Sequence, residues 1–362
     1  MQITGAVLER CGAPAPFTAS RPLAIGPLEL DPPGPGELLV RIETAGLCHS
    51  DLSVVDGSRV RPVPMLLGHE AAGIVEAAGP GAAIAPGRRV VMTFLPRCGA
   101  CEACATHGRL PCSVGSAANA AGTLVGGEVR LHRGDTPVKH HLGVSAFATH
   151  AVVSATSVVP VDDDVPPDIA ALLGCAVLTG GGAVVNAGRP ESGQAIAVVG
   201  LGGVGMAALL VAKALGHRVI GVDTVPAKLD MARELEAEAR TPAEAEGLRV
   251  PLVIEAAGSA RAFETAYALT APGGTTVTVG LPHPDARASI APLSLTAEAR
   301  TIVGSYLGSA VPGEDIPRYV ELWRAGRLPL DRLVSDRIGL DALPTALDRL
   351  ASGEALRQLI EF

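Results

Sequence analysis

Four cysteines lie close together in the first half of the chain, and their spacing limits how this segment can fold. Cys98, Cys101 and Cys104 follow one another at intervals of three residues, and Cys112 comes after a gap of seven residues. Four thiolates in this pattern can bind one Zn²⁺ tetrahedrally, which leaves no position on the metal for water or substrate. An iron–sulfur cluster fits less well, because there is no Cys-Pro ending and no second cysteine cluster. We therefore predict a structural zinc site here, with four free thiols in a loop as the alternative.

The overall composition is that of an ordered globular protein large enough for two domains. Of the 362 residues, 48% are hydrophobic and 18% are charged, which argues against a disordered chain. The net charge of −8 argues against nucleic acid as a main partner. The first residues lack a basic region followed by a long apolar core, and the richest apolar stretch, 195–215, is interrupted by glycines. We expect a cytoplasmic protein with no signal peptide and no membrane span.

Short apolar segments separated by proline and glycine turns occupy the first half of the chain. Strands are predicted in four of these segments: 5–10, 37–45, 69–78 and 88–93. Strands at such short spacing indicate a compact, barrel-like β domain. Two segments are expected to lack regular structure, namely a turn-rich connector at 27–36 and a Gly-rich loop at 112–137.

Strands and helices alternate from about residue 177 onward, which is typical of a parallel sheet with helices on both faces. The predicted strands are 195–199, 218–222, 252–255 and 275–279. Helices are expected after the first of these strands to about 216, and at 226–238 and 260–269. The crossover around 238–250 is short and polar, so we expect it to be trimmed. The chain ends with two predicted helices and a last strand: 315–325, 340–351 and the region of Leu359.

A glycine motif follows the first strand of this second half. Gly200, Gly202 and Gly205 form G-x-G-x-x-G at the start of a predicted helix. Such glycines allow a tight turn, close approach of a pyrophosphate to the backbone, and close packing of helix on strand. Asp223 ends the next strand, where a carboxylate can accept both ribose hydroxyls and would repel a 2′-phosphate. The motif therefore predicts a dinucleotide site that prefers NAD to NADP, with a Gly-rich turn that binds no nucleotide as the alternative.

Three cysteines remain outside the cluster, and two of them suggest a second metal site. Thiols stay reduced in the cytoplasm, so a metal explains them better than a disulfide does. Cys48 and Cys175 are far apart in the sequence, and His69 begins a predicted strand. Two thiolates, one imidazole and an open position make up the catalytic zinc of alcohol dehydrogenation. Cys11 is expected to be a small apolar residue near the N-terminus.

Two carboxylates stand beside these predicted ligands. Asp51 lies three residues after Cys48, and Glu70 directly follows His69. We expect one carboxylate to orient the imidazole and the other to tune the metal.

These motifs occur together in one known family. Gly68-His69-Glu70-x-x-Gly73, the four-cysteine cluster and Gly200-Leu-Gly-Gly-Val-Gly205 resemble the zinc-dependent alcohol dehydrogenases of the medium-chain dehydrogenase/reductase family, over nearly the whole chain. The resemblance implies an α/β protein in which a GroES-like β-barrel catalytic domain is joined to a Rossmann cofactor domain with a doubly wound parallel sheet. The implied divisions are 1–176 for the catalytic domain with its zinc lobe, 177–307 for the Rossmann domain, and 308–362 for the return to the catalytic domain.

The resemblance also implies roles for individual residues. It makes Cys48, His69 and Cys175 the catalytic zinc ligands and Ser50 the hydroxyl that takes the alcohol proton, with Asp51 as the partner of His69 and Glu70 as a nearby carboxylate. It places Thr179 and Val204 near the nicotinamide, and His49 and Arg357 near the pyrophosphate. The full implied cofactor set is Gly200, Gly202, Gly203, Val204, Gly205, Asp223, Lys228, Thr179, His49 and Arg357. The implied substrate pocket is Phe94, Ala117, His141, Leu142 and Tyr306.

The implied pocket is mainly apolar, and His141 is its polar exception. This imidazole either meets a hydroxyl or ring substituent of the substrate or faces water at the rim. The chain departs from the family at three places: His49 stands where liver-type enzymes usually have Arg, Ser53 where some relatives have a relay His, and 113–116 lacks the Arg of glutathione-dependent formaldehyde dehydrogenases. The segment 301–309 is similar to the one that joins two Rossmann domains across a dimer axis.

The sequence thus predicts an NAD-dependent zinc alcohol dehydrogenase with two Zn²⁺ per chain, active on primary aromatic, allylic or medium-chain alcohols. The expected assembly is a homodimer or a dimer of dimers. Two alternatives remain open: a formaldehyde dehydrogenase that depends on another cellular thiol, and a zinc- and NAD-binding protein without catalysis.

Overall fold

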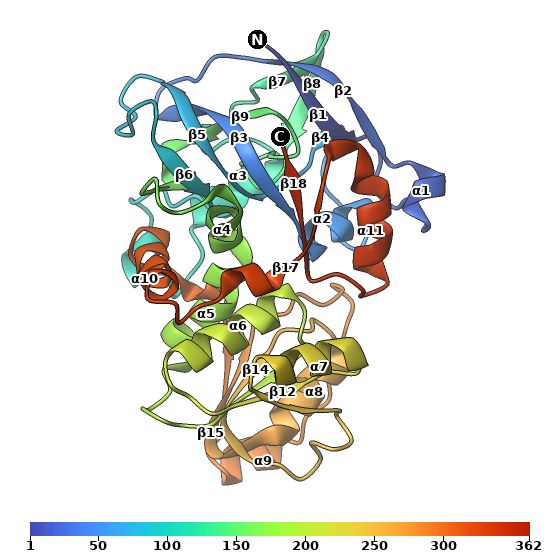
Figure 1. Ribbon diagram of the computed structural model, residues 1–362, viewed down its shortest axis with the longest axis vertical. Coiled ribbons are helices and arrows are strands. Elements are labelled where there is room, and N and C mark those ends of the chain that lie inside the picture. The colour runs from blue at the N-terminus through green and yellow to red at the C-terminus, as the bar shows by residue number, and fades with distance from the viewer. The chain divides into compact units, whose positions relative to one another are not determined.

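The computed structural model describes all 362 residues and divides them into two compact units. The first unit contains Met1–Cys175 and Val334–Phe362, and the second contains Ala176–Leu333. Both ends of the chain therefore belong to the first unit. Figure 1 shows this return: the C-terminal strand β18 (Arg357–Glu361, red) lies beside β3 (Glu37–Leu47, blue), and the two strands pair antiparallel.

Two β-sheets form the framework of the first unit. Five short strands close a barrel in the order β1 (Gln2–Leu8), β2 (Leu23–Leu30), β7 (Leu131–Arg133), β8 (Thr136–His140) and β4 (Met65–Leu66). The second sheet has the order β10 (Val158–Val161), β6 (Arg89–Met92), β5 (Glu70–Ala78), β3, β18 and β17 (Val334–Ile338), and β9 (His150–Ser154) pairs with β3. The predicted barrel-like β domain is confirmed.

Strand β3 illustrates how the sequence builds the core of this unit. Leu38, Val40 and Ile42 are buried, whereas Arg41 between them is exposed, because successive side chains of a strand point to opposite faces of the sheet. The buried set packs in one apolar cluster with residues of helix α11 (Leu343–Ala351). The other helices of this unit are α1 (Phe17–Ser20), α2 (His49–Val55), α3 (Ser113–Ala121), α4 (Pro167–Leu172), and the short turns η1 (Cys104–Thr106), η2 (Ala155–Ser157) and η7 (Leu340–Ala342).

The second unit is built on one sheet in which every pair of neighbouring strands is parallel. Its order is β13 (Glu238–Arg240), β12 (Val219–Val222), β11 (Ile196–Val199), β14 (Val250–Glu255), β15 (Thr270–Thr278) and β16 (Thr301–Gly304). The central strands β11 and β12 are buried along their whole length, as expected for a sheet covered on both faces.

Four helices connect strands of this sheet, as the alternating pattern predicts: α6 (Gly203–Ala214), α7 (Pro226–Glu234), α8 (Ala260–Leu269) and α9 (Pro292–Ala297). Helix α5 (Leu178–Gly182) and the short turn η4 (Ala183–Gly188) precede the first strand, and the turn η5 (Leu307–Ser309), helix α10 (Pro312–Arg324) and the turn η6 (Leu330–Leu333) follow the last one. Helix α7 ends earlier than predicted, because Glu238 already belongs to β13. The crossover before β14 contains no helix, which agrees with its short polar sequence.

Two segments that we expect from the sequence to be irregular have regular structure. Part of the predicted connector 27–36 belongs to β2, which pairs with β1 along its length. The predicted loop 112–137 contains α3, β7 and the start of β8. Helix α3 forms because the Cys112 sulfur accepts a hydrogen bond from the Gly115 amide and caps its first turn, and it ends at Gly122 with φ of 68°. Four of its nine residues are alanines, which have high helix propensity, but its side chains show no clear apolar period.

The return to the first unit begins at Val334, later than the predicted residue 308. The reason is that η5 and α10 pack within the second unit. The backbone of Gly308 lies so close to Leu178 that a Cβ on this glycine would be 2.2 Å from the Leu178 carbonyl oxygen. The Asn186 amide donates a hydrogen bond of 3.2 Å to Asp315 of α10, and Tyr319 of α10 is fully buried.

One helical run, Pro167–Gly188, is long and apolar enough by length and composition to cross a membrane, with a mean hydropathy of 1.8. This differs from the expectation that 195–215 is the richest apolar stretch and that no run reaches such a length. Within the apolar window of this run, 89% is buried inside the protein. Its apolar side chains therefore contribute to the protein core.

Asp348 of α11 caps the short helix α1 and ties the two ends of the chain together. Its carboxylate accepts hydrogen bonds from the amides of Phe17 (2.6 Å) and Thr18 (3.1 Å). Replacing Asp348 by Ala should cost about 1 kcal/mol, as is typical of a lost helix cap, and lower the melting temperature by roughly 2–4 °C. Thermal unfolding measures this effect, with Glu354→Ala, an exposed carboxylate beyond the same helix, as the control. An unchanged melting temperature for Asp348→Ala would contradict the prediction.

Candidate metal and active site

The three predicted ligands of a catalytic metal lie together in the first unit. Cys48 lies between β3 and α2, His69 immediately precedes β5, and Cys175 lies in the π-helical segment η3 (Leu173–Val177) after α4. One ligand atom from each residue lies within 4.8 Å of the other two, and all three residues are buried. The Cys175 sulfur is 3.5 Å from the His69 Nε2 atom. Elements that are distant in the sequence thus bring two thiols and one imidazole to one point.

This spacing fits a tetrahedral zinc ion. Zinc bonds of about 2.3 Å to sulfur and 2.0–2.1 Å to nitrogen place the two ligand atoms about 3.6 Å apart at a tetrahedral angle. The observed sulfur–nitrogen distance of 3.5 Å agrees with this value. Hydrogen bonding to Cys175 and the charge of Arg357 lower the pKa of the Cys48 thiol well below its ordinary value, against desolvation by burial. This environment therefore favours the thiolate of Cys48, whereas the hydrogen bond with Cys48 and burial raise the pKa of the Cys175 thiol well above its ordinary value.

Asp51 fixes the orientation of the imidazole. Its Oδ1 atom is 3.1 Å from His69 Nδ1 and accepts a hydrogen bond of 3.2 Å from the Gly68 amide, and its Oδ2 atom accepts one of 3.1 Å from the Cys48 amide. Burial raises the pKa of the Asp51 carboxyl, but the charge of His69 and hydrogen bonds from imidazoles lower it by more. Because an ionised carboxylate can only accept, Nδ1 of His69 carries a proton, and Nε2 is the nitrogen left to bind a metal beside the two cysteines.

A second buried carboxylate lies on the other side of the cysteines. Glu70 pairs with Arg357, whose Nε atom is 3.2 Å from Glu70 Oε1 and whose Nη2 atom is 3.6 Å from the Cys48 sulfur. Burial raises the pKa of the Glu70 carboxyl to about 7, against the opposing charge of Arg357. Gly46 makes room for this pair, because a Cβ at that position would lie 2.6 Å from Glu70 Oε1. The contact of Arg357 with Glu70 and Cys48 is not visible in the sequence.

The predicted pocket residues are divided between the two units. Phe94 stands edge-on to the His69 ring at 5.7 Å between ring centroids, and Leu142 is buried in the same unit. His141 is only 1% exposed, which excludes the alternative that it is a rim residue facing water. Ala117 lies on the exposed side of α3, and Tyr306 belongs to the second unit, where it is partly buried.

Helix α2 carries the residues predicted for proton transfer and for the pyrophosphate. His49 is exposed at the start of the helix, and Ser50 is partly buried between His49 and Asp51. The hydroxyl of Ser53 donates a hydrogen bond of 2.7 Å to the His49 carbonyl. Ser53 therefore bonds within its own helix, whereas Ser50 directly precedes Asp51 in the chain.

The four-cysteine cluster forms a separate centre. Cys98 and Cys104 have sulfurs 4.0 Å apart, and Cys101 and Cys112 have sulfurs 3.8 Å apart. Four zinc–sulfur bonds of about 2.3 Å place tetrahedral sulfurs about 3.8 Å apart, so the cluster fits a closed zinc site. The Cys112 sulfur also accepts 3.4 Å hydrogen bonds from the amides of Cys98 and Gly115, which fix its position.

The glycine motif in the second unit has the geometry of a phosphate-binding turn. Gly200 has φ of +91°, which allows the sharp turn after β11, and a Cβ at Gly205 would lie 1.8 Å from the Gly200 carbonyl oxygen. Gly202 has no atom within 4 Å of the position of a Cβ and caps the N-terminus of α6. An open backbone at a helix N-terminus fits the approach of a pyrophosphate. The residues present therefore suit a dinucleotide.

Asp223 holds the same turn. Its carboxylate accepts hydrogen bonds of 2.6 Å from the Leu201 amide and 2.9 Å from the Val225 amide. The remaining predicted cofactor residues lie on the surrounding helices: Thr179 on α5, Gly203 and Val204 on α6, and Lys228 on α7.

Sequence analysis missed Glu255, which organises the loop after β14. Its buried carboxylate accepts hydrogen bonds from the amides of Ala257 (2.9 Å) and Gly258 (2.7 Å) and from the Thr278 hydroxyl (2.8 Å). A charged residue at the carboxyl end of an otherwise apolar strand is the signal that could have identified it.

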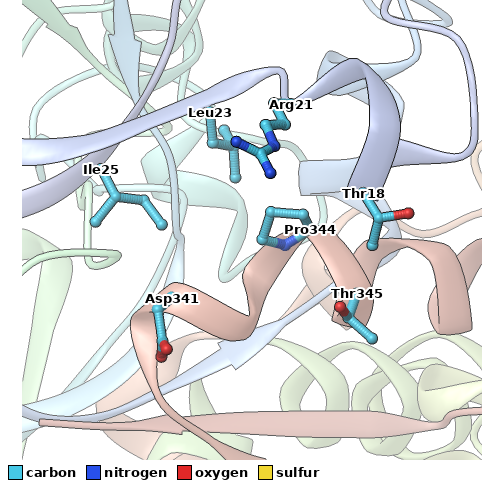
Figure 2. Close-up of a pocket in the computed structure, with 7 residues that line it drawn as sticks. All are labelled: Thr18, Arg21, Leu23, Ile25, Asp341, Pro344 and Thr345. Atoms are coloured by element: carbon cyan, nitrogen blue, oxygen red, sulfur yellow. The ribbon is translucent and has the colours of Figure 1, made fainter.

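A surface pocket of about 400 Å³ lies elsewhere in the first unit. Figure 2 shows its lining residues, which are Thr18, Arg21, Leu23, Ile25, Asp341, Pro344 and Thr345, with Arg21 extended over the Pro344 ring. They belong to α1, the connection between α1 and β2, β2 itself and the segment from η7 to α11, and they share no residue with either cysteine centre. This pocket is therefore separate from the candidate active site.

Two family models match the chain. A model described as "Alcohol dehydrogenase GroES-like domain" matches residues 34–163, and one described as "Zinc-binding dehydrogenase" matches residues 203–324. Together with the barrel, the parallel sheet and the two cysteine centres, they define the class of protein as a two-domain zinc-binding dehydrogenase.

Similar proteins of known activity show which kind of zinc-binding dehydrogenase the chain resembles. The chain is 35% identical to the NDMA-dependent alcohol dehydrogenase of Amycolatopsis methanolica over 95% of this chain and 96% of that protein. It is 36% identical to the geraniol dehydrogenase of Castellaniella defragrans, over 94% and 95%. The crystal structure of benzyl alcohol dehydrogenase from Acinetobacter calcoaceticus superposes with a TM-score of 0.91 at 30% identity, covering 100% of this chain and 99% of that one.

The chain therefore belongs to the zinc-type alcohol dehydrogenases of the medium-chain dehydrogenase/reductase family. Members of this class are oxidoreductases that act on CH–OH donors, and their substrates are small-molecule alcohols. The GroES-like and Rossmann-like fold expected from the sequence is confirmed.

Proposed function

We propose that this protein is an NAD-dependent alcohol dehydrogenase that interconverts primary aromatic, allylic or medium-chain alcohols and their aldehydes. The observation that carries the proposal is the buried set of Cys48, His69 and Cys175, with His69 oriented by Asp51. Three protein ligands leave the fourth tetrahedral position for the oxygen of a substrate.

Zinc and NAD, when bound, would supply the chemistry that side chains cannot. Zinc would stabilise negative charge on the alcohol oxygen, and the nicotinamide ring would accept the hydride of the carbinol carbon. The protein residues hold and orient the reactants. Cys48 and Cys175 contribute two negative charges, and Arg357 balances the nearby Glu70. The pair of Asp51 and His69 keeps the ligand nitrogen directed at the metal position.

Ser50 is proposed to accept the hydroxyl proton of the alcohol. It lies between His49 and Asp51 on α2, close in sequence to the ligand Cys48, and its hydroxyl can pass a proton toward the cofactor ribose. Ser53 is bonded to the His49 carbonyl within the same helix, which argues against a further role in the relay.

NAD is the proposed cofactor because a carboxylate stands at the expected ribose position. Asp223 lies at the end of β12 beside the glycine turn. A carboxylate there attracts ribose hydroxyls and repels the 2′-phosphate of NADP. The proposed contacts of Thr179, Val204, Gly203, Lys228, His49 and Arg357 with the cofactor rest on their positions relative to the family motif.

The proposed assembly contains two Zn²⁺ per chain, one at Cys48, His69 and Cys175 and one at the four-cysteine cluster. A homodimer or a dimer of dimers is proposed because β16 forms one edge of the parallel sheet, which leaves one side of this strand without a neighbour. A cytoplasmic location is proposed because the two predicted metal sites need reduced thiols.

An apolar pocket sets the proposed substrate class. Phe94, Leu142 and Tyr306 are its proposed walls, and each buried methylene of a substrate contributes about 0.8 kcal/mol. Benzyl alcohol and hexanol should therefore bind better than ethanol. The names of two relatives, a geraniol dehydrogenase and a benzyl alcohol dehydrogenase, agree with a large apolar substrate.

The competing function is a formaldehyde dehydrogenase that depends on a low-molecular-weight thiol. The absence of Arg from 113–116 argues against glutathione as that thiol. A binding protein without catalysis is the weaker alternative, because the complete ligand set and Ser50 are both present.

A comparison of substrates tests the proposed function. With NAD, kcat/KM for benzyl, cinnamyl or hexyl alcohol should exceed that for ethanol by at least about tenfold, since two extra buried methylenes already contribute about 1.6 kcal/mol. NADP should replace NAD poorly. A tenfold preference for ethanol or S-hydroxymethylglutathione, or formaldehyde turnover that requires an added thiol, would contradict the proposal.

Ser50→Ala tests the proton transfer. The variant should lose roughly 10²–10⁴-fold in turnover, the usual range for a positioned proton-transfer group, while NAD binding and zinc content stay unchanged. Ser53→Ala is the matched control on the same helix and should have little effect. Steady-state kinetics with benzyl alcohol compare the two variants, and the opposite ranking would show that the relay is assigned to the wrong hydroxyl.

A further inference from the structure

We propose that His141 is a positioning residue of the catalytic zinc site, which acts through Asp51 to hold the ligand His69 in place. This inference rests on the proposed zinc-binding function of Cys48, His69 and Cys175. It goes beyond that function, because it assigns to His141 a role in the support of the metal site as well as a place in the pocket.

The side chain of His141 is directed at the carboxylate that orients His69. Its Nδ1 atom lies 3.1 Å from Asp51 Oδ1, the same oxygen that faces His69 Nδ1 at 3.1 Å. The two atoms are close, but their geometry makes no hydrogen bond, so the contact is an electrostatic one between the imidazole and the carboxylate. Together with the Gly68 amide at 3.2 Å, three nitrogen atoms surround this one oxygen. His141 therefore belongs to the polar shell of Asp51.

The ring of His141 also contacts the ring of His69 directly. The two centroids are 5.4 Å apart with an interplanar angle of 86°, and Phe94 makes a similar edge contact with His69 at 5.7 Å and 85°. Such edge-on contacts between rings are favourable and restrict rotation. Phe94 and His141 thus limit the movement of the His69 ring, while Asp51 holds its Nδ1 atom.

The backbone around His141 is fastened to the segment that carries His69. The Ser145 hydroxyl accepts a hydrogen bond of 2.8 Å from the His141 amide and donates one of 2.8 Å to the Leu66 carbonyl. Leu142 and Ser145 both have left-handed backbone conformations, with φ of 52° and 54°. Non-glycine residues persist in such conformations only where their surroundings enforce them. The turn therefore fixes the imidazole relative to residues 66–69.

The polarity of this side chain is itself informative. His141 is 1% exposed and Asp51 is fully buried. Burying a polar ring costs free energy unless it has a polar partner, and the neighbouring Phe94 shows that an apolar ring fits beside His69. The electrostatic contact with the Asp51 carboxylate at 3.1 Å offsets part of this cost.

The experiment compares zinc release from variants that remove or return individual polar atoms of the His141 side chain. His141→Phe keeps an aromatic ring and removes both nitrogens. His141→Asn returns an N–H group near the Nδ1 position, and His141→Gln returns one near the Nε2 position. Each purified protein is loaded with zinc and mixed with a chelating dye, and the rates of fast and slow release and the total zinc per chain are recorded.

The zinc of the four-cysteine cluster serves as the internal reference, because it shares no residue with this site. His140→Gln is the matched control. The Nε2 atom of this adjacent buried imidazole accepts from the Arg130 amide at 3.1 Å, and a glutamine keeps an acceptor there. His140→Gln should release both zinc ions at the wild-type rates.

We expect His141→Phe to release the catalytic zinc about tenfold faster than the wild type, at the lower end of the effect of losing a partner of a ligating histidine. His141→Asn should release the catalytic zinc at nearly the wild-type rate, whereas His141→Gln should release it as fast as His141→Phe does. Wild-type release from His141→Phe, or equal behaviour of the Asn and Gln variants, would overturn the positioning role.

Two further outcomes separate this inference from others. Three zinc ions in the wild type and two in His141→Phe would show that Asp51, His69 and His141 form a metal site of their own, which would overturn the positioning role. A wild type with zinc only at the four-cysteine cluster would overturn the proposed function itself, and this result is visible before any variant is made.

Discussion

The buried carboxylate of Asp51 connects three parts of the first unit that the sequence separates. It accepts from the Cys48 amide at the start of α2, from the Gly68 amide before β5, and it faces the Nδ1 atom of His69. Because it is ionised and can only accept hydrogen bonds, it determines which nitrogen of His69 carries the proton. The direction of the Nε2 lone pair, and hence the geometry of the proposed metal site, depends on this one interaction.

The charges of the zinc ligands and of the neighbouring Glu70–Arg357 pair would nearly cancel once zinc is bound. Cys48 and Cys175 supply two thiolates for a divalent ion, and the Glu70 carboxylate is paired with the Arg357 guanidinium at 3.2 Å. A buried ion pair is costly to break, because the remaining partner stays in a region of low polarity. The last strand of the chain therefore has a chemical as well as an architectural function: β18 completes the sheet next to β3 and brings Arg357 to the cysteines.

Much of this arrangement could be predicted from the sequence, because zinc and dinucleotides limit the residues that bind them. Cysteine spacing, a glycine motif after a strand, and Asp223 after the next strand need no tertiary information.

What could not be predicted depends on sheet order and backbone turns. Glu70 and Arg357 meet because β5 and β18 flank β3 on opposite sides. His141 is buried beside a turn with left-handed residues at 142 and 145, which the sequence does not reveal. Helix α3 escaped prediction because its small residues show no apolar period, and its cap is a cysteine sulfur.

The central claim is that Cys48, His69 and Cys175 hold a zinc ion with an open position. Anomalous difference density measured at the zinc absorption edge from crystals of the purified protein tests it most directly. We predict one peak at the four-cysteine cluster and a second peak about 2.3 Å from the sulfurs of Cys48 and Cys175 and about 2.0–2.1 Å from His69 Nε2. A peak at the cluster with none between Cys48, His69 and Cys175, in protein that oxidises alcohols, would contradict the account.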